Sequence, residues 1–239
     1  MLTHTLLIES NDPIVAAAGL IYRVRRGSTG APLIVMIHGL GGDENVMWIF
    51  ERALPAKATV IAPRAPIWIE PNTPYAEEAN GGYSWFRPAP LPRPDRSTFE
   101  QSIDKLKKFV EAAIKTYEVD RNQVYLLGFS QGAAMCYALS LAMPDQIAGV
   151  IALAGFMPES TDKPLPPDIE VSGLPQNGYL ILHGLEDERL PIEYARTAQS
   201  TLQSIGAQVE HHEYPIGHKI SPQGMKDIEQ WLKKATADG

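Results

Sequence analysis

The stretch VYLLGFSQGAAMCYALSLA, residues 124–142, decides the fold class. It opens with an apolar run typical of a strand buried in a parallel sheet and closes with a run long enough for a helix. Between them, GFSQG has the GxSxG pattern, in which a serine occupies a strained strand-to-helix turn and neighbouring backbone excludes side chains at Gly128 and Gly132. A glycine- and serine-rich turn could match by chance, but the flanking strand and helix favour Ser130 as an exposed nucleophile.

The rest of the chain repeats this alternation of strand and helix. Apolar runs predict strands at residues 33–39, 59–63, 124–128, 147–155 and 179–184. Amphipathic or apolar stretches predict helices at residues 44–54, 97–117, 131–142, 192–205 and 221–234. The second of these helices is expected to begin with a capping box of Ser97 and Glu100. The order predicts a doubly wound, mostly parallel sheet with helices on both faces, in one domain covering residues 1–239.

Two proline-rich segments interrupt the alternation. Residues 63–96 hold eight of the twenty prolines and several aromatic residues, which favours an irregular excursion packed near a pocket. Residues 158–178 hold five prolines and few aromatic residues, so this segment is either a mobile flap or a surface loop.

A serine nucleophile needs a base and an orienting acid, which follow it in the order serine, acid, histidine. His218, in the loop after the predicted last strand VEHHEY, is the favoured base. His211 and His212 lie inside that strand, where one is expected to face a helix and the other to face away. The acid comes from Glu186, Asp187 and Glu188, which follow the strand at 179–184; Asp187 is preferred, although spacing does not separate the three.

The backbone amides that would stabilise an oxyanion come from two turns. Gln131 N–H lies at a helix N-terminus beside the nucleophile, and Leu40 N–H lies in the glycine-rich turn HGLGG at residues 38–42. His38 and His183, each at a strand end, are interpreted as structural residues. No three-ligand set has the spacing of a metal site, so no metal is expected. Cys136 is expected to be a small core residue.

Composition narrows the classes of partner. The chain has 239 residues, of which 44% are hydrophobic, as in ordinary globular proteins. Its net charge of -7 argues against nucleic acid and anionic lipid surfaces as partners. The single cysteine cannot form an intrachain disulfide. The first ten residues lack the features of a signal peptide, and no apolar run approaches the roughly 20 residues that span a bilayer. We therefore expect a cytoplasmic protein without stable membrane insertion, and the oligomeric state stays open, a homodimer included.

GFSQG, HGLGG, HGLED followed by RLP, and GHKIS occur in order, and over residues 30–235 the chain resembles the phospholipase/carboxylesterase family of α/β-hydrolases, which includes the acyl-protein thioesterases. The resemblance implies an α/β-hydrolase fold, a triad of Ser130, Asp187 and His218, an oxyanion hole of Leu40 and Gln131 N–H groups, and no cofactor. Acyl-protein thioesterases usually have an acidic residue where this chain has Arg87, and a shorter oxyanion loop.

These departures favour a serine carboxylesterase that cleaves small to medium acyl esters of small molecules. An acyl-thioesterase or a lysophospholipase would use the same triad, and a noncatalytic ligand-binding relative would keep only the pocket. The side chains expected to line the acyl pocket, with ordinary core packing as the alternative for each, are Trp48, Trp85, Phe86, Phe156 and Met157.

Overall fold

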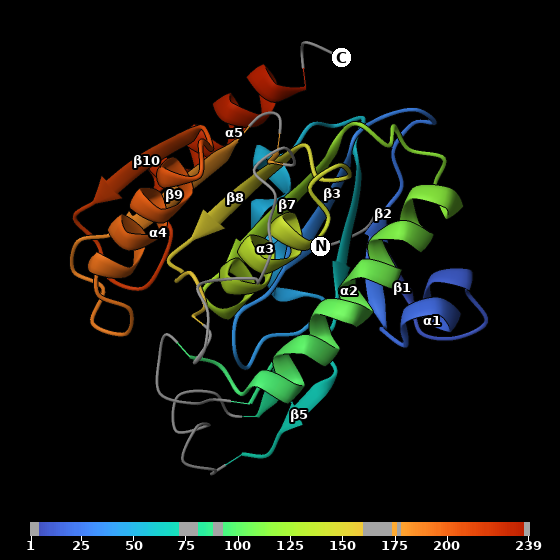
Figure 1. The fold of residues 1–239 in the computed structure, drawn as a ribbon. Helices are drawn as coiled ribbons and strands as arrows, with labels where there is room; N and C mark the ends of the chain where they lie inside the picture. Colours follow the sequence, from blue (N-terminus) through green and yellow to red (C-terminus); the bar gives the residue numbers. More distant parts are fainter. Residues whose placement is uncertain (1–4, 72–80, 88–92, 160–173, 176–177, 237–239) are drawn as a thin grey trace.

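The computed structural model describes residues 5–71, 81–87, 93–159, 174–175 and 178–236 (Figure 1). The strands are β1 (Leu6–Ile8), β2 (Tyr22–Arg25), β3 (Leu33–Ile37), β4 (Thr59–Pro63), β5 (Ile67–Ile69), β6 (Gly82–Ser84), β7 (Val124–Phe129), β8 (Gly149–Leu153), β9 (Tyr179–Gly184) and β10 (Val209–Tyr214). The helices are α1 (Pro13–Ala18), the 3-10 helix η1 (Val46–Ala53), α2 (Arg96–Thr116), α3 (Gln131–Ala142), α4 (Glu193–Ser204) and α5 (Pro222–Ala235).

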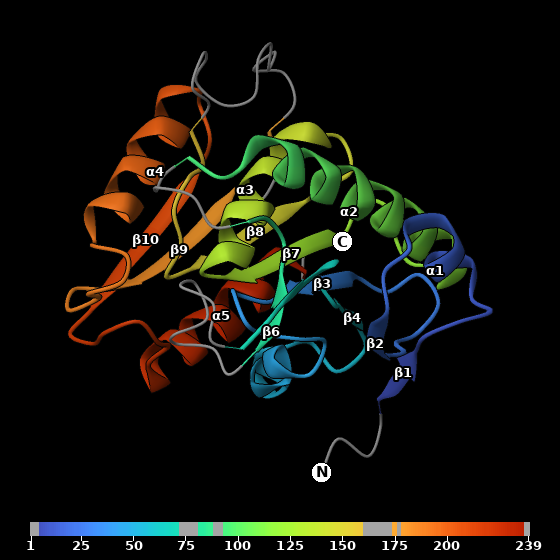
Figure 2. The same cartoon turned by 90° about the horizontal axis from the view of Figure 1, so that it is seen from below.

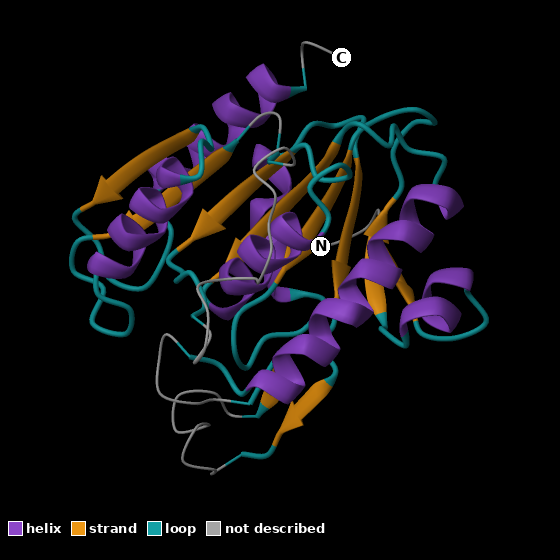
Figure 3. Ribbon diagram, viewed as in Figure 1, coloured by secondary structure: helices purple, strands orange, loops and turns teal. Residues whose placement is uncertain are grey.

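Eight strands form the central sheet, in the order β1-β2-β4-β3-β7-β8-β9-β10. β2 pairs antiparallel with both β1 and β4, and every later pair, from β4–β3 to β9–β10, is parallel. Figure 3 shows the strands of this sheet side by side, with β5 set apart from them. The doubly wound, mostly parallel sheet predicted from the sequence is therefore present, and the carboxyl ends of β3, β7, β9 and β10 share one edge.

Helices cover both faces of the sheet, and the strand residues alternate between the two resulting cores. Figure 2 shows α1, α2, α3 and α4 on one side of the sheet and α5 on the other. Val35 and Ile37 of β3 point into the first core, whereas Ile34 and Met36 point into the second, which also contains residues of η1 and α5. Burial on both faces explains why these strands are apolar throughout.

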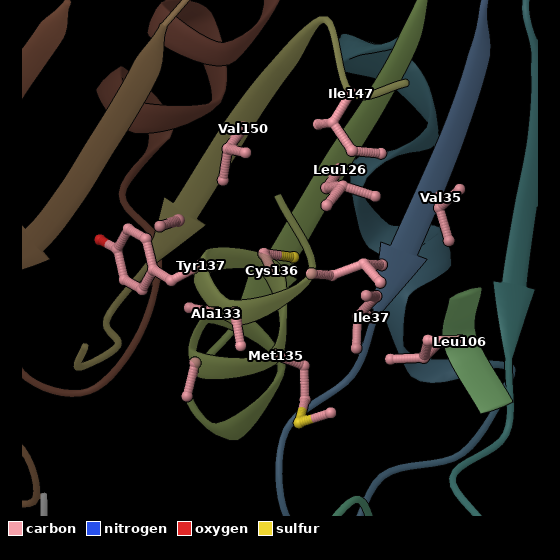
Figure 4. Packing of buried hydrophobic residues seen from close by; sticks show 14 of the residues in the cluster. Val35, Ile37, Leu106, Leu126, Ala133, Met135, Cys136, Tyr137, Ile147 and Val150 are labelled. Carbon is pink, nitrogen blue, oxygen red and sulfur yellow. The ribbon is translucent and has the colours of Figure 1, made fainter. Parts of the chain in front are cut away.

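The helix after the GFSQG motif lies inside the molecule. Eleven of the twelve residues of α3 are buried, which agrees with its lack of a polar face. Figure 4 shows Met135 and Cys136 of α3 among Ile37 of β3 and Leu126 of β7. Cys136 is fully buried, so its interpretation as a core residue is confirmed.

Two details of the predicted helices are wrong. The helix expected at 44–54 is the 3-10 helix η1, whose buried Met47, Phe50 and Ala53 recur every three residues, the period of a 3-10 helix. The capping box expected in α2 does not form: Asp95 is the N-cap, and its Oδ1 accepts from Thr98 N at 3.0 Å. Glu100 instead pairs with Arg96 one turn earlier.

The proline-rich segments are described only in part. Residues 63–96 were expected to be irregular, but they contain the antiparallel pair β5–β6, and residues 72–80 and 88–92 lie outside the described residues. Most of the expected loop at 158–178, and with it any flap, also lies outside them. No helix in the described part of the chain is long and apolar enough to cross a membrane.

Candidate active site

Ser130 sits on a strained turn between β7 and α3. Its φ of 54° and ψ of -115° lie in a region that residues other than glycine rarely adopt. Both neighbouring glycines are required, because a Cβ at Gly128 would lie 2.4 Å from Gly132 O and a Cβ at Gly132 would lie 2.0 Å from Ile37 O. The backbone therefore presents the Ser130 hydroxyl at the carboxyl edge of the sheet.

His218 and Asp187 reach Ser130 from the loops after β10 and β9. His218 Nε2 lies 3.0 Å from Ser130 Oγ, and His218 Nδ1 lies 2.7 Å from Asp187 Oδ2. The two loops are joined by the bond from Glu186 N to Ile216 O, at 3.0 Å. Because β9 and β10 are parallel neighbours, both loops leave the sheet at the edge where Ser130 lies.

Burial and hydrogen bonding distinguish Asp187 from its two acidic neighbours. Glu186 and Glu188 are exposed, whereas the Asp187 carboxylate is buried. Asp187 Oδ1 accepts from Arg189 N at 3.0 Å and from Leu190 N at 2.9 Å, so its own loop orients the carboxylate. Of the three, Asp187 is the one whose carboxylate contacts His218.

His183 is a neighbour of this group that the sequence did not identify as one. Its Nε2 lies 2.7 Å from Leu190 O and 3.4 Å from Asp187 Oδ2. Burial lowers the pKa of His183, which favours the neutral imidazole with Nε2 as the donor to Leu190 O. These contacts agree with the interpretation of His183 as a structural residue. The sequence signal for its closeness to Asp187 was the HGLED motif, which contains both residues.

The rival histidines of β10 have other partners. His211 Nδ1 lies 2.8 Å from Gln199 Oε1 of α4, and His212 Nε2 lies 2.7 Å from Glu210 Oε1. One of the two was expected to face away from the helices, but His211 contacts α4 and His212 Nδ1 lies 3.9 Å from Asp227 Oδ2 of α5, because helices cover both faces of β10.

The two candidate oxyanion amides come from segments that pack closely together. A Cβ at Gly39 would lie 3.2 Å from Phe129 O and 3.3 Å from Ser130 Cβ, so the loop that carries Leu40 runs directly beside the turn that carries Ser130 and Gln131. Gln131 is the first residue of α3, where backbone N–H groups point out of the helix end.

The Gln131 side chain has a second task that the sequence did not reveal. Its Oε1 accepts from Trp85 N at 2.8 Å, and its Nε2 donates to Phe86 O and Ser84 Oγ, both at 3.0 Å. Trp85 Nε1 donates to His38 O at 2.9 Å. The amide therefore fastens the segment after β6 to the start of α3. Only the fold brings these residues together, since 46 positions separate Trp85 from Gln131.

The five side chains expected near an acyl pocket separate into two groups. Trp48 belongs to the core between η1, α5 and the sheet, whereas Trp85, Phe86, Phe156 and Met157 belong to the core on the other face. Phe86 and Phe156 contact each other edge to face, with ring centroids 6.4 Å apart. All five are buried, and their role in an acyl pocket stays a prediction. Among the described residues, no cluster of three or more His, Cys, Asp or Glu side chains could hold a metal ion.

Known proteins resemble the chain over nearly its whole length. Acyl-protein thioesterase 1 of Debaryomyces hansenii is 29% identical over 233 residues, which cover 90% of this chain and 99% of that protein. Carboxylesterase SOBER1 of Arabidopsis thaliana is 27% identical over 218 residues, with 84% and 89% covered. The crystal structure of the Bacillus cereus carboxylesterase matches with a TM-score of 0.77 at 20% identity, over 93% of this chain and 97% of that one.

The chain also matches a protein family over most of its length. Residues 24–236 match the phospholipase/carboxylesterase family of α/β-hydrolases, which agrees with the fold class and with the resemblance noted in the sequence. The chain therefore belongs to the phospholipase/carboxylesterase family and is a carboxylic ester hydrolase with the α/β-hydrolase fold.

Proposed function

We propose that Ser130, His218 and Asp187 are a catalytic triad that hydrolyses small to medium acyl esters through an acyl-enzyme. The observation that carries the proposal is the chain of contacts from Ser130 Oγ to His218 Nε2, at 3.0 Å, and from His218 Nδ1 to Asp187 Oδ2, at 2.7 Å. Both distances suit the proton transfer and the orientation that a serine nucleophile needs.

In the proposed mechanism, His218 Nε2 takes the Ser130 proton as Oγ attacks the ester carbonyl. The N–H groups of Leu40 and Gln131 donate to the oxyanion of the tetrahedral intermediate. His218 then gives the proton to the leaving alcohol, and an acyl-enzyme remains on Ser130. Water, deprotonated by His218, attacks the acyl group and releases the acid, while Asp187 holds the imidazole orientation and stabilises its protonated form.

The preference for small to medium acyl groups rests on two features. Phe86, Phe156 and Met157 are buried in the core on the face of the sheet that α3 covers, where Phe86 and Phe156 contact each other edge to face. Arg87, which is exposed, stands where acyl-protein thioesterases usually have an acidic residue. Thioester hydrolysis is the second candidate, because relatives of nearly full-length similarity are named acyl-protein thioesterases. Lysophospholipase activity would use the same triad.

The first test is hydrolysis of p-nitrophenyl esters from acetyl to palmitoyl, with acyl-thioesters and lysolipids measured in parallel. Ser130→Ala should lower kcat by several orders of magnitude, and mass spectrometry should find a fluorophosphonate adduct on Ser130 of the wild type. Ser200→Ala, an exposed serine of α4, is the matched control and should keep full activity.

Each outcome selects one reading. A short-chain ester optimum supports the carboxylesterase, and a long-chain or thioester optimum supports the thioesterase or lysophospholipase. No turnover and no adduct would support a noncatalytic binding protein. Activity of Ser130→Ala within about tenfold of the wild type would refute the triad.

We propose in addition that residues 1–239 fold as one domain and that the protein works in the cytoplasm, whose reducing conditions suit a chain with a single cysteine. A single cooperative unfolding transition tests the first statement, and fractionation of the source cells tests the second. Sedimentation velocity distinguishes a monomer from a homodimer.

The mechanism uses only the side chains and amides named above, so full activity after treatment with a chelator is expected.

A further inference from the structure

The loop that carries the Leu40 amide gains little from apolar packing at Leu40. It runs from Gly39 to Asn45, between β3 and η1, and the Leu40 side chain is 39% exposed. Inside the loop, Gly42 N donates to Gly39 O at 3.1 Å and Asn45 N donates to Asp43 Oδ1 at 2.8 Å. Since apolar packing at Leu40 is incomplete, polar contacts with other elements must fix the loop against the sheet.

Two contacts of this kind tie the loop to the sheet: the bond from Arg23 Nε of β2 to Asn45 Oδ1, at 2.7 Å, and an ion pair between Glu44 and Arg64, which follows β4. Arg64 Nε lies 2.5 Å from Glu44 Oε2 and Arg64 Nη2 lies 2.8 Å from Glu44 Oε1, so the pair is bidentate. Glu44 is only 2% exposed. Burial pushes the pKa of Glu44 upward, but the hydrogen bonds and charge of Arg64, together with hydrogen bonds from the Glu44 backbone and the Asn45 side chain, keep this pKa below its usual value.

The same guanidinium contacts the strand that pairs with the loop. Arg64 Cζ lies 4.9 Å from the centre of the Tyr83 ring in β6. Tyr83 N donates to Gly42 O at 3.0 Å, and Gly41 N donates to Tyr83 O at 2.9 Å. A Cβ at Gly82 would lie 2.2 Å from Gly41 O, so this strand and the loop touch backbone to backbone.

Arg64 is itself fixed to the central sheet. Its backbone N donates to Ile21 O at 2.8 Å, next to the antiparallel pairing of β2 with β4. Arg64, whose backbone is fixed to the sheet, therefore contacts two residues that hold the loop. Glu44 lies in the loop, and the backbone of Tyr83 is hydrogen-bonded to it.

We propose that Arg64 is a positioning residue for catalysis: by holding Glu44 and Tyr83, it keeps the Leu40 amide where the oxyanion forms. The inference rests on the proposed function. It adds a requirement that the triad does not contain, since an oxyanion donor stabilises the transition state only when it is held close to its productive position. In this role Arg64 acts through the loop and does not itself contact the reacting atoms.

The test compares Arg64→Met, Arg64→Lys and Glu44→Gln with the wild type in p-nitrophenyl butyrate hydrolysis. Rates are expressed per serine labelled by a fluorophosphonate at completion, so that unfolded protein does not count. A trifluoromethyl ketone, whose adduct with Ser130 Oγ carries the oxyanion, supplies an inhibition constant. Arg196→Met is the matched control, because Arg196 forms an equally bidentate pair with Glu213 at an exposed position on α4.

Arg64→Met should lower kcat by about tenfold to 100-fold and raise the inhibition constant of the ketone by a similar factor, with KM changed less than about threefold. Arg64→Lys, which keeps the charge but not the bidentate fork, should be intermediate, and it carries the comparison if Arg64→Met does not fold. Arg196→Met should match the wild type.

A purely structural role for the pair would lower the melting temperature while kcat per labelled serine and the inhibition constant stayed within about twofold of the wild type; that result would overturn the inference. If the wild type is active and the Arg64 variants are unaffected, only the role of Arg64 is refuted, and the proposed function stands. An inactive wild type refutes the proposed function, and this inference with it.

Discussion

Acidification should destabilise the protein through His38, a buried residue at the end of β3. His38 is 0% exposed, its Nε2 lies 3.0 Å from Ala65 N, and its Nδ1 lies 2.7 Å from Gly39 O. A backbone N–H can only donate, so Nε2 must be the acceptor and Nδ1 must carry the proton that bonds Gly39 O. Burial lowers the pKa of His38 from 6.5 to about 4, so the folded protein keeps this imidazole neutral.

The sign and size of the effect follow from this pKa. Because the unfolded chain binds the proton near pH 6.5 and the folded chain only near pH 4, the stabilising contribution is present above pH 6.5 and is lost as the pH falls toward 4. The full difference corresponds to about 3 kcal/mol, of which about 2 kcal/mol is lost between pH 7 and pH 5. Urea unfolding at pH 5, 6 and 7 measures the loss.

His38→Gln separates this residue from the other groups that titrate. The glutamine Oε1 can still accept from Ala65 N but takes up no proton, so the variant should lose about 2 kcal/mol less than the wild type between pH 7 and pH 5, whatever its stability at pH 7. His212→Gln, at a position 37% exposed, is the control and should keep the wild-type loss. An equal loss in the wild type and in His38→Gln would refute the reasoning.

Three further predictions concern the site and its support. Asp187→Asn should lower kcat for p-nitrophenyl butyrate by about 10,000-fold, because an amide cannot hold the His218 tautomer; a loss below tenfold would contradict this role. Gln131→Met should lower the free energy of unfolding by about 2 kcal/mol in urea titrations, because it leaves Trp85 N–H buried without its acceptor, and a stability equal to the wild type would show that the bond contributes nothing. Cys136, whose pKa is raised by burial, should resist iodoacetamide in the folded protein and react after unfolding; rapid alkylation of native protein would mean that α3 opens.

The parallel part of the fold could be predicted because burial on both faces leaves a local record in the sequence. The apolar runs at 59–63 and 179–184 coincide with β4 and β9 residue for residue. The antiparallel start of the sheet was not predicted, because β1 and β2 have only three and four residues; two residues of β1 are exposed, and β2 alternates buried with half-buried residues. β1 pairs with β2, and β2 pairs with β4; runs of three and four residues are too short for a period to be read from the sequence.

The candidate site could be predicted only as far as its residues are fixed by motifs. GFSQG specifies its own turn, because a side chain at either glycine would clash with nearby backbone. The acid was narrowed to three neighbours by spacing, and only the buried contact of Asp187 with His218 distinguishes it. The partners of Glu44 and Gln131 could not be read at all, because each contact joins segments at least twenty positions apart.

These unpredicted contacts explain how the site edge is held. Polar groups cost free energy when buried unless they are bonded, and in the described part of the chain several of the buried polar side chains lie at or beside the carboxyl edge of the sheet: His38, Glu44, Ser84, Gln131, His183 and Asp187. Each of the six has at least one hydrogen-bond partner among the described residues, and His183 Nδ1 is the one ring nitrogen of the two histidines there without one. An apolar edge would be simpler to stabilise, so the concentration of paired polar groups there agrees with the proposal that this edge must hold the Leu40 and Gln131 amides and the His218 imidazole in place.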